Sequence, residues 1–334
     1  MSQSEADTSA MARPLPPNLV SVFTQALKSY QLSSATFRVL CSLTPSSLAS
    51  SPAEPPVLHP PQVPPKALLV LDSSFNPPTL AHQRMAMSAL SDHNDSNHKS
   101  RILLLLAINN ADKAPKPAAF PQRLAMMYIF AQDLLAATSK STSTSPSDPT
   151  SNNTCGGVDI AVTTEPYFHA KSSAVALSEF YRGTTTPAPE TPGPGAEAEA
   201  MEQVYLTGFD TLIRIFNPKY YSGASGMATA LDPFFARARL RVTMRTDAEW
   251  GDAAAQREYL EKLRRGELER VGGRTEWVER IEMEDGRKEG EEVVSSTKVR
   301  DAVHRQDWEA LKRLVSEDVT GWIRDEGLYT ETGV

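Results

Sequence analysis

Short segments of strand character recur along the chain, and each is followed by a stretch of helical character. The predicted strands occupy residues 67–71, 101–107, 158–163, 203–207 and 239–245. The helices predicted after them occupy residues 80–90, 121–137, 172–181, 210–216 and 247–265. The first two, 67–71 and 101–107, are almost wholly apolar, which is typical of strands buried on both faces. Their alternation with helices predicts an α/β fold with a doubly wound parallel sheet.

Further elements flank this alternation. Residues 36–43 and 277–283 are predicted strands, and Asn18 is predicted to cap a helix over 19–30. Short helices are predicted near the end of the sequence, over 297–304, 308–314 and 319–326. In doubly wound sheets, ligands bind beyond the carboxyl ends of the strands, so residues that directly follow strands are the candidates for a site.

Four segments hold too little apolar surface to offset the entropy of ordering them. We expect 1–17 to be a disordered N-terminus, 44–65 a Pro-rich linker, and 138–154 and 184–200 disordered insertions. Residues 18–43 then form an N-terminal helix and strand. Residues 66–330 form one domain that the two long insertions interrupt.

Charge and apolar runs exclude some classes of partner. The chain has 34 basic and 41 acidic residues, a net charge of −7, which argues against a general nucleic-acid-binding protein. The longest apolar run, 102–108, is far shorter than the roughly 20 residues that span a membrane. Without a visible secretory signal or a disulfide framework, the chain is expected to be intracellular, cytoplasmic and/or nuclear. Protein partners could bind the Ser/Pro-rich segments.

The first predicted strand of the domain leads into a polar turn and a helix start, over residues 71–82. Thr79 can cap that helix, whose N-terminal N–H groups suit a phosphate. His82 falls one turn into the helix and could donate to a phosphate oxygen. The alternative is a Pro-stiffened loop in which the histidine caps a carbonyl.

Other polar residues also follow predicted strands or begin helices. Ser296 and Thr297 stand at a helix start, with Arg300 one turn on, where a guanidinium can grip phosphate oxygens. Capping alone also explains these hydroxyls. Gly208 and Asp210 follow another strand, and an aspartate there could be an ordinary helix cap. Lys113 and Lys116 follow the strand predicted over 101–107, and either could simply be solvated.

Two of these patterns carry a family resemblance. Residues 73–82, Ser-Ser-Phe-Asn-Pro-Pro-Thr-Leu-Ala-His, resemble the first signature of the nicotinamide mononucleotide adenylyltransferases. That family belongs to the nucleotidylyltransferase superfamily of the His-x-Gly-His type. Residues 294–300 resemble its Ile-Ser-Ser-Thr-x-x-Arg signature, and 205–212 resemble its strand followed by Gly-x-Asp-x-Leu. Ser73 stands where the family has glycine, and Thr79 stands at its first histidine position.

The resemblance implies a site, and its residues are expectations from the family. Catalytic roles fall on His82 and Arg300. ATP and phosphate binding falls on Ser73, Ser74, Phe75, Thr79, His82, Lys113, Gly208, Asp210, Ser296, Thr297 and Arg300. Mononucleotide binding falls on Ser74, Phe75, Lys113, Tyr167 and Phe168. Lys113 and Lys116 both fit the lysine that contacts phosphate in the family, with Lys113 preferred. Trp250 is the alternative aromatic residue for the pyridine ring.

The implied reaction is adenylyl transfer from ATP to nicotinamide mononucleotide, and also to nicotinic acid mononucleotide, giving NAD and pyrophosphate in the first case. Mg²⁺ is expected as the cofactor, bound through ATP, with no metal site in the protein itself. Two alternatives remain open. The chain could be a nucleotidylyltransferase or ATPase with another substrate, or a degenerate member that acts as a protein-interaction adaptor.

Overall fold

The computed structural model describes residues 13, 15–48, 55–93, 100–109, 118–141, 155–182, 201–223, 226–245, 250–286 and 291–330. Within them lies a seven-stranded sheet of order β1-β4-β3-β2-β5-β6-β7. Its strands are β1 (Phe37–Leu43), β2 (Ala67–Asp72), β3 (Arg101–Ala107), β4 (Val158–Thr163), β5 (Glu202–Gly208), β6 (Ala238–Thr243) and β7 (Ile281–Glu284). Only the pairing of edge strand β1 with β4 is antiparallel; the other pairings are parallel.

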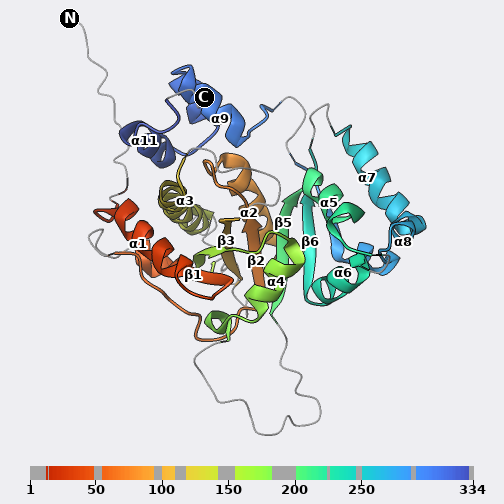
Figure 1. The fold of residues 1–334 in the computed structure, drawn as a ribbon. Coiled ribbons are helices and arrows are strands. Elements are labelled where there is room, and N and C mark those ends of the chain that lie inside the picture. The colour runs from red at the N-terminus through yellow and green to blue at the C-terminus, as the bar shows by residue number, and fades with distance from the viewer. Residues whose placement is uncertain are drawn as a thin grey trace, which may run out of the picture.

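Helices cover both faces of the sheet (Figure 1). One face packs against α1 (Leu19–Gln31), α2 (Leu80–His93) and α3 (Phe120–Ser141). The other packs against α4 (Phe168–Ala176), α5 (Phe209–Ile215), α6 (Gly226–Arg237) and α7 (Ala253–Lys262). The predicted doubly wound architecture is confirmed.

Side-chain alternation along the central strands explains why these segments are almost wholly apolar. In β2, Leu69 and Leu71 belong to the core on the side of α1–α3, whereas Leu68 and Val70 belong to the core on the side of α4–α7. All four side chains are buried. A strand buried on both faces has no solvated side, so its sequence reads as a continuous apolar run.

A third cluster joins the end of the described chain to α3. The helices α9 (Ser296–His304), α10 (Trp308–Lys312) and α11 (Glu317–Asp325) pack on Met126 and Ile129 of α3. Figure 1 shows α11 beside α3 and α9 at the same end of the sheet. This packing brings the second signature close to the first.

The structure corrects several predicted elements. Helix α1 begins as predicted, but Asn18 is left-handed (φ 58°) and makes no side-chain cap. The helix predicted over 172–181 begins earlier, at Phe168. The helix predicted from residue 247 begins at Ala253, where Asp252 caps it by accepting from the Ala255 N–H at 2.8 Å. The strand predicted over 277–283 starts with a 3-10 helix, Thr275–Arg280.

Helix α6 was not predicted from the sequence. It contains Pro233 and begins at Gly226, two residues that usually mark the ends of helices. Its buried residues Met227, Leu231, Phe234 and Phe235 follow a helical spacing, which was the available signal.

Short helical segments complete the described chain: α8 (Leu268–Arg270), a π-helical turn (Leu263–Glu267) and 3-10 helices at Pro45–Leu48, Glu179–Tyr181 and Pro218–Tyr220.

The boundaries of the predicted disordered segments are partly wrong. Helix α3 runs to Ser141, into the segment predicted to start at 138, because Thr138 is buried and bonds to the carbonyl of Leu135 at 2.7 Å. At the end of the predicted N-terminal tail, Arg13 forms ion pairs with Asp133 and Asp318. Residues 1–12, 142–154 and 183–200 lie outside the described residues.

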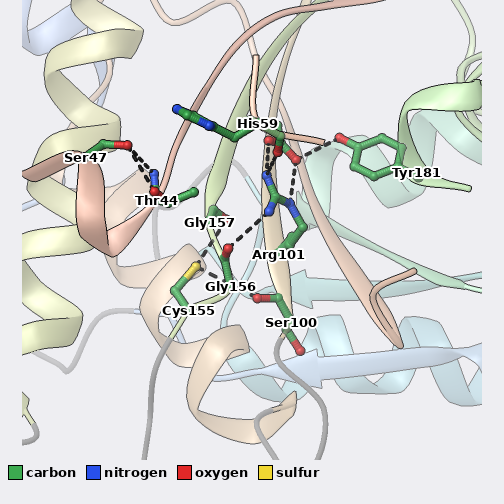
Figure 2. Close-up of polar contacts among 10 residues, drawn as sticks. Thr44, Ser47, His59, Ser100, Arg101, Cys155, Gly156, Gly157 and Tyr181 are labelled. Atoms are coloured by element: carbon green, nitrogen blue, oxygen red, sulfur yellow. Dashed lines mark hydrogen bonds and ion pairs between the residues drawn. The ribbon is translucent and has the colours of Figure 1, made fainter. Parts of the chain in front are cut away.

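The Pro-rich segment contributes to the fold, and residues 18–43 do as well. The Val57 carbonyl accepts from the N–H of Ser42 in β1 at 2.8 Å. The segment then reaches a polar network at the amino ends of β3 and β4, where Figure 2 shows His59 next to Arg101. The N-terminal helix and strand are therefore parts of the same packed unit as the rest of the described chain.

That network is built around a buried ion pair. Arg101, the first residue of β3, pairs with Asp159 of β4 at 2.5 Å, and their side chains are 6% and 0% exposed. The guanidinium also donates to the carbonyls of His59 and Gly156 (Figure 2). The Tyr181 hydroxyl donates to Asp159 at 3.1 Å. Burial alone would lower the pKa of Arg101, but Asp159 outweighs this and raises it.

No helix among the described residues is long and apolar enough to cross a membrane.

Candidate functional site

The turn between β2 and α2 carries the first signature. Phe75 is left-handed (φ 43°), and its side chain is fully buried against the core. Asn76 is buried as well, and its Oδ1 accepts from the Ala118 N–H and the Tyr329 hydroxyl, both at 2.8 Å. The turn is thus fixed from behind by groups far away in the sequence.

The second signature docks directly on the first. Helix α9 begins after Ser295, whose Oγ accepts from the Lys298 N–H at 3.3 Å. The next hydroxyl, on Ser296, donates to the Pro77 carbonyl at 2.8 Å. Arg300 donates from Nη1 to the Asn76 carbonyl at 2.7 Å and from Nη2 to Thr297 at 3.2 Å. Two patterns more than 200 residues apart therefore form one structure.

Replacing Tyr329 by phenylalanine should loosen this structure without disturbing the core. The change removes the hydrogen bond to Asn76 Oδ1, and we expect it to lower the free energy of unfolding by about 1 kcal/mol. Urea unfolding of the Tyr329→Phe protein measures this. An unchanged midpoint would show that the tyrosine does not stabilise the turn.

His82 lies three residues into the helix start, and both of its ring nitrogens have partners. Nδ1 accepts from the backbone N–H of Thr79 at 3.0 Å and contacts the Thr79 hydroxyl at 2.8 Å. A backbone N–H can only donate, so Nδ1 carries no proton. In the neutral ring the proton is on Nε2, which contacts Ser73 Oγ at 3.0 Å. The histidine caps a backbone N–H, as the third residue of a capping box does, and not a carbonyl.

Burial lowers the pKa of His82 to about 4. Because this value is below that of an unfolded histidine, the unfolded chain takes up the proton first as pH falls. We therefore expect the contribution of His82 to stability to be complete above about pH 6.5 and to be lost as pH falls towards 4. An NMR titration of the imidazole measures this, and a midpoint near 6.5 would contradict it.

A cavity of about 560 Å³ opens at the carboxyl ends of the central strands. Of the predicted residues, those that line it are Ser73, Thr79, His82, Phe168, Gly208, Asp210 and Ser296. Five elements supply this wall: the β2–α2 turn, α2, α4, the β5–α5 junction and the start of α9. The cavity holds the polar groups of both signatures on the edge where parallel strands place a ligand.

The wall at β5 contains a close backbone approach. A Cβ atom on Gly208 would lie 2.7 Å from Asp210 Oδ1, so a side chain there would displace the carboxylate. Asp210 in turn accepts from Arg245 Nη1 at 3.2 Å. Arg245 follows β6 and lines the same cavity. The predicted aspartate therefore orients a cation at the cavity wall.

Other predicted residues do not line the cavity. Ser74 and Thr297 are exposed, Phe75 is in the core, and Arg300 is half-buried against the Asn76 carbonyl. Tyr167 is partly exposed and stacks on His169, with ring centroids 5.6 Å apart. Trp250, the alternative aromatic, packs beside the core and lies outside the lining. Lys113 and Lys116 lie outside the described residues.

Comparison with known proteins decides the family. No family model matches the chain. A protein of Schizosaccharomyces pombe, described as "Putative nicotinamide mononucleotide adenylyltransferase", is 31% identical over 260 residues, which is 78% of this chain and 84% of that protein. The chain belongs to the nicotinamide mononucleotide adenylyltransferase family.

Two solved structures are also similar to the chain. Plasmodium falciparum nicotinic acid mononucleotide adenylyltransferase complexed with NaAD is 14% identical, with a TM-score of 0.40, over 79% of this chain and 97% of that one. The same enzyme complexed with APC is 12% identical, with a TM-score of 0.39, over the same shares of the two chains.

Some residues that line the cavity of this adenylyltransferase family member were not predicted from the sequence. Arg245 is the last residue of the strand predicted over 239–245, so its place at a strand end was the available signal. Asp72 is the last residue of β2 and pairs with Lys171 of α4. No signal in the sequence pairs those two residues, because they are 99 positions apart.

Proposed function

We propose that this protein transfers an adenylyl group from ATP to nicotinamide mononucleotide, giving NAD and pyrophosphate. An oxygen of the mononucleotide 5′-phosphate attacks the α-phosphorus in line. The bond from that phosphorus to the bridging oxygen breaks as the new bond forms, and pyrophosphate leaves with the electron pair. Both reactants are anions, so catalysis here consists of positioning and charge stabilisation.

One observation carries the proposal: the two signatures meet at the cavity edge. The start of α2 and the start of α9 lie together because Ser296 and Arg300 bond to the carbonyls of Pro77 and Asn76. Two helix N-termini at one edge favour anions, since each offers backbone N–H groups and a positive dipole end.

We assign His82 to the phosphates of the substrates. Its Nε2–H points to Ser73 Oγ at 3.0 Å, a weak partner that a phosphate oxygen can replace. Nδ1 stays fixed by Thr79, so the ring keeps its orientation through the reaction. Arg245 supplies a cation that lines the same cavity, where Asp210 holds it. Lys113 remains the proposed lysine contact.

We propose that Mg²⁺ binds as a complex with ATP. Among the described residues, no group of three or more His, Cys, Asp or Glu side chains is arranged to hold a metal ion. A Mg²⁺ carried by the triphosphate and water needs no such group, so the cavity residues fit this mode. The metal, when bound, neutralises charge on the triphosphate.

A substrate panel tests the proposal. The purified chain is incubated with ATP, Mg²⁺ and either nicotinamide mononucleotide, nicotinic acid mononucleotide or a nucleotide without a pyridine ring, and products are separated by chromatography. NAD and pyrophosphate are expected with nicotinamide mononucleotide. Failure to bind any mononucleotide by calorimetry would favour the adaptor alternative.

A further inference from the structure

A buried ion pair lies at the floor of the cavity and has no role in the function proposed above. Lys171 Nζ and Asp72 Oδ2 are 2.5 Å apart, and their side chains are 6% and 7% exposed. Asp72 ends the central strand β2, and Lys171 is in α4, one turn after Phe168. Removing two charges from water is costly, so the pair needs more explanation than stability alone.

The two charged residues differ in their access to the cavity. Asp72 and Phe168 line it, whereas Lys171 is not part of the lining. The Lys171 ammonium lies behind them, 5.3 Å from the centre of the Phe168 ring. Among the described residues, Lys171 is the only group that hydrogen-bonds to the Asp72 carboxylate, and it uses Oδ2. A bound ligand therefore meets the carboxylate first.

A fixed carboxylate in a partly dry wall accepts hydrogen bonds and repels anions, and both effects are stronger than in bulk water. The two pyridine mononucleotides differ only in one ring substituent. The carboxamide of the nicotinamide form is neutral and has N–H donors. The carboxylate of the nicotinic acid form is negative and has none. Sites built around a hydrogen-bond donor reject analogues that lack it.

We propose that Asp72, held in place by Lys171, is a specificity-determining residue that favours nicotinamide mononucleotide over nicotinic acid mononucleotide. This inference rests on the proposed adenylyl transfer. Phe168 packs against the pyridine ring, and Asp72 accepts from the carboxamide. Lys171 moderates the charge of Asp72 and fixes its rotamer.

The test is the ratio of kcat/KM for the nicotinamide form to kcat/KM for the nicotinic acid form. The wild-type ratio should be well above one. Asp72→Asn should lower it about tenfold, because the repulsion is lost and an amide N–H can donate to the substrate carboxylate. Lys171→Met should raise it, because the carboxylate loses its counter-charge. The double variant, Asp72→Asn with Lys171→Met, leaves no unpaired buried charge and should also have a lower ratio than the wild type.

The two single variants are expected to shift the kcat/KM ratio in opposite directions, which distinguishes a role in specificity from a purely structural role. A structural role would lower kcat/KM for both substrates alike and leave the ratio unchanged. Glu309→Gln, at an exposed ion pair on α10, serves as the charge control and should not move the ratio. This inference alone is overturned if the wild type prefers the nicotinic acid form. It is also overturned if the variants remain active and their kcat/KM ratios equal that of the wild type. If the wild-type protein forms no dinucleotide from either substrate, the proposed function is overturned together with this inference.

Discussion

Replacing His82 by alanine is expected to lower the rate of dinucleotide formation by about 10²–10³-fold. The change removes the Nε2–H that we assign to the phosphates, at the point where charge develops in the transition state. It also removes the acceptor for the Thr79 N–H, so the start of α2 loses one fixed contact. Initial rates with ATP, Mg²⁺ and nicotinamide mononucleotide measure the effect.

His93→Ala is the matched control for this variant. His93 ends the same helix, its ring contacts the Ala89 carbonyl at 3.0 Å, and it lies outside the cavity lining. Turnover should stay near the wild-type value. If the His82→Ala protein is folded and its rate equals that of the wild type, His82 has no role in the reaction.

Breaking the Arg101–Asp159 pair should produce the largest loss of stability. Arg101→Met leaves a carboxylate that is 0% exposed without its counter-charge, and of the residues that the structure describes only Tyr181, through its hydroxyl, still donates to it. We expect the free energy of unfolding to fall by about 3–5 kcal/mol. Chemical unfolding, followed by circular dichroism, measures this loss.

The double variant Arg101→Met with Asp159→Leu tests the cause. It removes both charges and keeps apolar volume, so most of the lost stability should return. Lys312→Met breaks the exposed pair with Glu309 and should cost less than about 1 kcal/mol. Equal losses in the single and double Arg101 variants would mean that packing, not unpaired charge, explains the effect. Because the pair lies at the amino ends of the strands, folded variants should keep their turnover number.

The buried strands could be predicted from the sequence, and some helices could not. Strands β3 and β4 have the predicted bounds, since apolar side chains dominate both and the charged exceptions, Arg101 and Asp159, pair with each other. Helix α6 escaped prediction because Gly226 and Pro233 are typical of turns, and tertiary packing of Phe234 and Phe235 overrides that preference. The cap predicted at Asn18 failed because the residue adopts a left-handed conformation.

The site was predictable where its residues are neighbours in sequence. Ser73, Thr79 and His82 meet because a single turn carries them. The meeting of Ser296 and Arg300 with that turn depends on how α9 to α11 pack on α3, which local pattern does not encode. Lys171 illustrates the limit, because a lysine in a helix is ordinarily read as solvated, and only the fold shows it buried against Asp72.

The most direct test of the adenylyl-transfer account is the fate of the α-phosphate of ATP. The chain is incubated with Mg²⁺, nicotinamide mononucleotide and ATP labelled at the α-phosphorus, and the labelled products are separated. The account predicts label in NAD, with one pyrophosphate released for each NAD formed. Label that appears only in ADP, at a rate independent of the mononucleotide, would contradict it and would indicate an ATPase.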